Sequence, residues 1–84
     1  MKTIHIKYFA SIREAVGLGT ETVNTVAPTV EALRDELIAR GGVYAESLAR
    51  GKAVRVAINQ TLAIETAPLV GGAEVAFFPP VTGG

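Results

Sequence analysis

The chain has 84 residues, 49% of them hydrophobic, and its eight Lys and Arg residues balance eight Asp and Glu residues. This length fits one domain, and the balanced charge excludes the basic field that nucleic acid or an anionic membrane requires. The sequence has no cysteine, which excludes disulfides and thiolate metal sites. It shows neither an apolar run long enough to span a membrane nor a leader, so membrane insertion is excluded and we expect a cytoplasmic protein.

The chain begins with a predicted strand and a short helix. Residues 2–9 alternate apolar and polar side chains, which indicates a half-buried strand with Phe9 on its polar side. Ser11 and Glu14 have the spacing of a capping box, so we expect Ser11 to cap a short helix that Gly17 ends.

A second strand and the main helix follow. Residues 20–26 are rich in β-forming side chains and predict a strand antiparallel to the first. Thr29 is the expected N-cap of a helix that Gly41 and Gly42 end. Its polar side, on which we place Arg34, should face water, and its apolar stripe should face a sheet. The stripe consists of Val30, Leu33 and Leu37, with Ile38 beside it.

The second half of the chain predicts three more strands. Residues 43–50 indicate a short helical turn or a loop, and residues 54–59 alternate as a third strand. A two-residue turn at Asn59-Gln60 should lead into residues 61–64, and residues 74–78 form the last strand.

This order of elements indicates an α+β fold. One main helix laid across one face of a mixed sheet of four to five strands is the β-grasp, or ubiquitin-like, architecture. That architecture makes the first and last strands central parallel neighbours. We expect the β-grasp domain to span residues 1–78 and an extended tail to span residues 79–84.

The tail has an unusual composition. Pro79 and Pro80 lack the N–H that a sheet ladder needs, and consecutive prolines favour an extended polyproline conformation. Six such residues reach about 20 Å. Gly83 and Gly84 carry no side chains, so a partner can approach the backbone and the terminal carboxylate closely. The tail, which also contains Val81 and Thr82, has no charged residue and so predicts an arm that enters another protein; a frayed, inert end is the alternative.

The side chains contain no recognisable catalytic site. His5 has no cysteine or acidic cluster near it in the sequence and is interpreted as an exposed strand residue. No nucleophile, general base or metal site is predicted, so we expect no bound cofactor and no active site on this chain. Alternation instead places three large apolar residues outside the core, which predicts a patch for a protein partner: Phe9, Leu62 and Phe78.

The sequence resembles the small, sulfur-carrier subunits of molybdopterin synthase. The resemblance is most specific in the ending Phe-Phe-Pro-Pro-Val-Thr-Gly-Gly and covers nearly the whole chain, with departures in residues 17–26 and 41–53 and at Arg55. It extends through residues 9–14, 28–34, 56–62 and 74–76.

The resemblance implies a sulfur-donor subunit of a sulfurtransferase complex, with the active site on the large subunit. The expected assembly is a heterotetramer with two copies of each subunit. An E1-like partner is expected to use ATP to adenylate Gly84, which is then converted to a thiocarboxylate and donates sulfur to cyclic pyranopterin monophosphate. The resemblance assigns Phe78, Leu62 and Arg13 to the partner surface, and strand parity adds Phe9.

Three alternatives stay open at this point. A sulfur carrier for thiamine or thiolated-tRNA synthesis shares the fold and the Gly-Gly ending. A ubiquitin-like modifier would form isopeptide bonds with lysines. A plain β-grasp binding module would have an inert tail.

Overall fold

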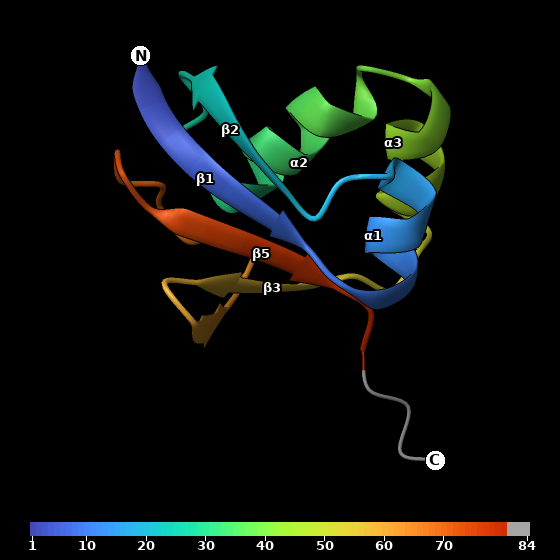
Figure 1. The fold of residues 1–84 in the computed structure, drawn as a ribbon. Helices are drawn as coiled ribbons and strands as arrows, with labels where there is room; N and C mark the ends of the chain where they lie inside the picture. The colour runs from blue at the N-terminus through green and yellow to red at the C-terminus, as the bar shows by residue number, and fades with distance from the viewer. Residues whose placement is uncertain (81–84) are drawn as a thin grey trace.

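The computed structural model describes residues 1–80. Five strands form one mixed sheet in the order β2-β1-β5-β3-β4, with β1 and β5 parallel at its centre and all other neighbours antiparallel (Figure 1). The predicted α+β, β-grasp arrangement is confirmed. The elements are β1 (Lys2–Tyr8), α1 (Ala10–Val16), β2 (Thr20–Thr25), α2 (Val30–Ile38), α3 (Gly42–Ser47), β3 (Arg55–Ile58), β4 (Thr61–Ala63) and β5 (Glu74–Phe78).

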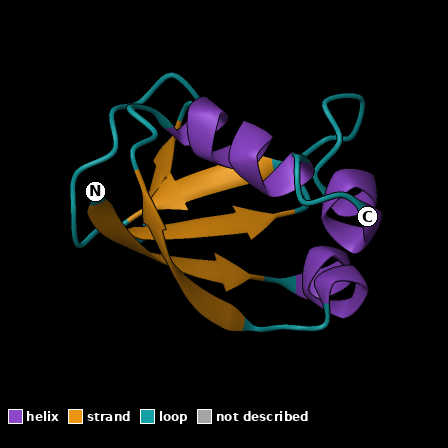
Figure 2. Cartoon of the chain, turned by 90° about the horizontal axis from the view of Figure 1, so that it is seen from above, coloured by secondary structure: helices purple, strands orange, loops and turns teal. Residues whose placement is uncertain are grey.

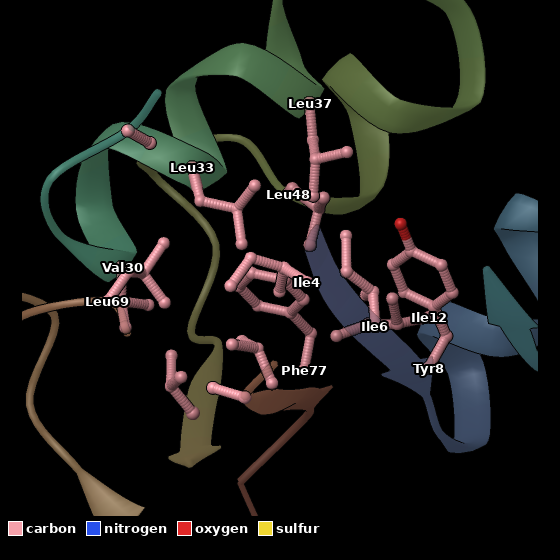
Figure 3. Close-up of a cluster of buried hydrophobic side chains, with 14 residues drawn as sticks. Ile4, Ile6, Tyr8, Ile12, Val30, Leu33, Leu37, Leu48, Leu69 and Phe77 are labelled. Atoms are coloured by element: carbon pink, nitrogen blue, oxygen red, sulfur yellow. The ribbon is translucent and has the colours of Figure 1, made fainter. Parts of the chain in front are cut away.

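The core lies between α2 and one face of the sheet. The helices gather on that side, with α1 and α3 at the end of the sheet where β1 and β5 finish (Figures 1 and 2). The predicted stripe of α2 is buried and meets alternate residues of β1 and β5. Figure 3 shows these side chains pointing toward one another, among them Ile4, Ile6, Val30, Leu33, Leu37 and Phe77.

Several local predictions are confirmed. The Thr29 hydroxyl accepts a hydrogen bond from the Ala32 amide at 3.3 Å and caps α2. Gly17 ends α1 in the left-handed conformation, with φ at 84°. Asn59 and Gln60 both have positive φ, as a tight hairpin turn between β3 and β4 requires.

Two predicted helix boundaries are wrong. The N-cap of α1 is Phe9 and makes no side-chain cap, so Ser11 lies inside the helix and forms no capping box with Glu14. Phe9 stays extended because its amide donates to the Phe77 carbonyl at 3.2 Å, and the helix begins directly after that pairing ends. α2 ends at Ile38, before the two glycines, and Gly41 instead precedes α3.

The prediction that Arg34 faces water is also wrong, because Arg34 is only 2% exposed. Its guanidinium donates to the carbonyls of Leu48 at 2.8 Å and Ala49 at 2.7 Å, and pairs with Glu65 at 2.9 Å. Carbonyls after a short helix have no partners within it, and Arg34 supplies donors to them. Arg34 thereby ties α2 to the end of α3 and to the segment after β4.

A second polar cluster supports the end of β1. The Glu21 carboxylate accepts hydrogen bonds from Tyr8 at 2.7 Å and Tyr44 at 2.9 Å and pairs with Arg40 at 2.9 Å. Burial opposes ionisation of Glu21, but these three donors hold its pKa below the usual value, while burial and the adjacent carboxylate raise the pKa of Tyr8. The Tyr8 ring stacks on Phe77 with ring centroids 6.2 Å apart, so the cluster fixes the aromatic pair beneath the end of β5.

Candidate partner-docking site

The candidate site lies on the outer face of the sheet, the face opposite α2. Pairing across the strands sets Lys7 beside Ala76, Ala76 beside Ala57, and Ala57 beside Leu62. Side chains alternate along each strand, so this row faces outward while the adjacent row containing Tyr8, Phe77 and Val56 faces the core. The outer face therefore has two small residues at its centre.

A groove of about 710 Å³ lies over these two alanines. Ala57 and Ala76 are buried although they are on the outer face, because larger side chains surround them. The lining residues are Lys7, Phe9, Ala10, Ala57, Gln60, Glu74, Ala76, Phe78, Pro79 and Pro80. A groove with an apolar floor and aromatic walls fits an apolar side chain of a partner protein.

The structure brings together Phe9, Phe78, Pro79 and Pro80, four residues that the sequence singled out. The extended backbone of Phe9 runs beside β5, since its amide bonds to the Phe77 carbonyl, and this places Phe9 next to Phe78. Phe9 is 45% exposed and Phe78 is half-buried. The two rings form the wall nearest to the prolines that follow β5.

Leu62 and Arg13, the other two predicted partner residues, are not among the residues that line this groove. Leu62 is 70% exposed on the edge strand β4 and directly opposite Ala57. Arg13 is one helical turn after Phe9, with its amide donating to the Phe9 carbonyl at 3.2 Å. Its guanidinium lies against Gly19, where an added Cβ would be 3.3 Å from Nε, so the absence of a side chain at residue 19 leaves room for it.

The other predicted tail residues, Val81, Thr82, Gly83 and Gly84, lie outside the described residues. The extended form and the chemical role predicted for them therefore stay predictions.

Sequence reasoning missed the floor of the groove and its polar end. No role was predicted for Ala57 or Ala76, although small residues between large apolar ones on paired strands are a signal for a depression. The polar end is formed by Lys7 and Glu74, whose side chains pair at 3.3 Å, and by Gln60. This ion pair depends on the parallel pairing of β1 with β5, which no local pattern displays.

Residues 1–80 contain no group of three or more His, Cys, Asp or Glu side chains placed to hold a metal ion. His5 is exposed and its Nδ1 lies 3.2 Å from the Thr22 hydroxyl on β2. Within the same described range, no helix has the length and apolar character needed to cross a membrane. The groove is thus the feature of the described chain that best fits a binding role.

Comparisons with known proteins agree with this picture. Residues 6–84 match the model of the ThiS family. The chain is 48% identical to the molybdopterin synthase sulfur carrier subunit of Escherichia coli K12, over 96% of this chain and 99% of that protein.

Two solved structures share the fold. One is the small archaeal modifier protein 1 of Haloferax volcanii, with a TM-score of 0.77, 24% identity, and coverage of 96% of this chain and 100% of that one. The other belongs to the protein–protein complex of subunits 1 and 2 of the molybdopterin-converting factor from Helicobacter pylori, with a TM-score of 0.66, 23% identity, and coverage of 98% and 99%. The family match shows that the chain belongs to the ThiS family, and the chain resembles the molybdopterin synthase sulfur carrier subunit over nearly its full length.

Proposed function

We propose that this chain is the sulfur carrier subunit of a molybdopterin synthase and delivers sulfur from its C-terminal Gly84. The observation that carries the proposal is the 48% identity to such a subunit over 96% of the chain. The groove supports it, because Pro79 and Pro80 line the groove and lead directly into the predicted arm. A partner that docks over Phe9 and Phe78 would therefore receive the residues that follow.

The first chemical step in this proposal activates Gly84. A carboxylate resists nucleophiles because its charge is delocalised and its oxygen leaves poorly. An E1-like partner uses ATP to join the carboxylate to AMP, releasing pyrophosphate and creating a good leaving group. A sulfur donor at the oxidation level of sulfide then displaces AMP and leaves a thiocarboxylate on Gly84.

The second step transfers sulfur within the large subunit, which holds cyclic pyranopterin monophosphate. The thiocarboxylate sulfur forms a bond to a carbon of the pterin side chain as the oxygen substituent of that carbon leaves as phosphate or water. A further water then cleaves the bond between sulfur and the Gly84 carbonyl. Sulfur stays on the pterin, and the chain regains its carboxylate. Two loaded carriers supply the two sulfurs of the dithiolene, which fits a heterotetramer with two copies of each subunit.

Within this proposal the chain itself binds no cofactor, and ATP is consumed by the activating enzyme in the cytoplasm. Pro79 and Pro80 restrict the arm before binding and so reduce the entropy lost when it enters a partner. Gly83 and Gly84 allow two different enzymes to close around the backbone.

The proposal is tested by intact mass spectrometry after incubation with ATP, a sulfide source and the cognate activating enzyme. We expect a mass increase equal to the exchange of one oxygen for sulfur, localised by fragmentation to Gly84. An unchanged mass with an active enzyme would contradict the proposal. Covalent attachment of the chain to lysines of other proteins would instead indicate a modifier.

Leu62, opposite the groove residue Ala57, gives a second prediction about the large subunit. Replacing Leu62 with glutamate should weaken binding to that subunit at least about tenfold, because a charge would be buried beside an apolar contact. The free energy of unfolding should change by less than about 0.5 kcal/mol, since Leu62 is 70% exposed. Titration calorimetry and urea unfolding provide the two measurements.

Val70→Glu is the matched control for Leu62→Glu. Val70 is also 70% exposed, but it lies in the segment before β5, near the start of β1 and away from the groove. It should bind the large subunit as the unchanged chain does. Equal weakening by both substitutions would show that the outer face of β4 has no special part in docking.

A further inference from the structure

Ion pairs neutralise only some of the charged side chains of residues 1–80. Of the eight Lys and Arg residues, four form ion pairs with carboxylates: Lys7, Arg34, Arg40 and Arg50. Lys2 donates to the carbonyls of Ala27 and Leu69. The remaining three, Arg13, Lys52 and Arg55, have no ion pair or side-chain hydrogen bond within the described range.

Two of these cations lie beside the end of β5, and the third lies on the neighbouring helix α1. Arg55 is paired directly with Phe78 across β3 and β5 and is exposed on the outer face. Lys52 and Pro79 line the same shallow depression on the side of α1 and α3. Arg13 lies on α1, one helical turn after Phe9, with its guanidinium against Gly19.

The carboxylates near this end of β5 form no ion pair with these three cations. Glu74 is paired with Lys7, and Glu14 on α1 and Glu46 on α3 carry no ion pair within the described range. The chain has no net charge, yet Lys52 and Arg55, beside the last described residues of β5 and after it, carry no ion pair within the described range. An uncompensated group of cations at a docking surface attracts a partner of opposite sign and steers its approach.

We infer that Lys52 and Arg55, together with Arg13, form a basic collar that docks against acidic side chains on the large subunit, around the opening that receives the arm. This inference rests on the proposed function and adds to it the charge of the receiving surface. It also gives Arg55 a role at the position where the sequence departs from the family. The apolar groove supplies contact area, and the collar sets the rate and orientation of encounter.

The collar is tested by comparing the association rate of the unchanged chain and of a Lys52→Gln, Arg55→Gln double variant with the large subunit. At low salt we expect the association rate of the variant to fall about tenfold, with a much smaller change in the dissociation rate. The difference in association rate between the two chains should disappear near 0.5 M salt, where the Debye length is only a few ångströms. Arg13 is kept, because its contact is already part of the proposed surface.

A Val26→Glu, Val70→Glu double variant is the control for net charge. It changes the net charge by the same amount as the two glutamine substitutions, but at exposed positions beside the start of β1. Its association rate should stay within about twofold of that of the unchanged chain. Stopped-flow fluorescence measures all rates, and circular dichroism confirms that each variant is folded.

The possible outcomes distinguish failure of the collar from failure of the proposed function. If the unchanged chain binds but the collar variant associates equally fast, or the control slows as much, the collar is refuted and the proposed function stands. A difference that persists at high salt also refutes it, because the effect would not be electrostatic. If the unchanged chain does not bind the large subunit at all, the proposed function fails and the collar with it. Tighter binding of the unchanged chain to a duplex oligonucleotide than to the large subunit would assign the cations to nucleic acid and refute the collar.

Discussion

Replacement of Gly84 with alanine is expected to slow sulfur loading or transfer by at least about a hundredfold while leaving the domain folded. The methyl group would have to fit beside the reacting carbonyl in two different enzymes, and a small displacement of reacting atoms costs about this much rate. Residue 84 lies outside the described residues, and the core of the domain is built from side chains between Ile4 and Phe77. The rate is measured as dithiolene formed in a reconstituted reaction with the activating enzyme and the large subunit.

Gly51→Ala is the control for this substitution. Gly51 lies in the segment between α3 and β3, and an added Cβ there would meet no atom within 4 Å. This variant should load and transfer sulfur normally. An additional residue after Gly84 should abolish activity altogether, because the carboxyl group to be activated would become an amide. Full turnover by Gly84→Ala or by the extended chain would refute the assignment of chemistry to the last carbonyl.

Replacement of Arg34 with methionine is expected to lower the free energy of unfolding by about 3 kcal/mol. Methionine retains much of the side-chain volume but provides no donor, so the Leu48 carbonyl loses its hydrogen bond from Arg34 and the Ala49 carbonyl keeps only the one from the Lys52 amide. Glu65 would also lose its buried partner. Urea unfolding followed by circular dichroism measures the change. An unaltered slope of the unfolding free energy against urea concentration would show that the same unfolding transition is compared.

Arg50→Met provides the comparison. Arg50 pairs with the same carboxylate, at 2.7 Å, and with Asp35, but its side chain is 44% exposed. Exposed ion pairs contribute about 0–1 kcal/mol, so this variant should lose no more than that. Equal losses at the two positions would show that burial of Arg34 is not what makes its contacts important.

Local patterns predicted most of the elements because the physics involved is local. Alternation along residues 2–9 and 74–78 was sufficient to identify strands, and the spacing of Val30, Leu33 and Leu37 identified the buried side of α2. Thr29 was found as a cap because its hydroxyl bonds to an amide three residues later. Ser11 has the same local pattern, but long-range pairing of Phe9 with β5 moved the start of α1.

The amino-acid sequence by itself determined the β-grasp class, because the order of strands and helices follows from side-chain periodicity. The partner roles of Phe78, Leu62 and Arg13 and the chemistry of Gly84 rest on the resemblance and stay predictions. Only the tertiary structure decided that Arg34 is buried and that Ala57 and Ala76 form the floor of a groove. It also decided that Lys52 and Arg55 lie around the end of β5. These facts depend on pairs of residues far apart in the chain, and their energies arise only when folding brings those residues into contact.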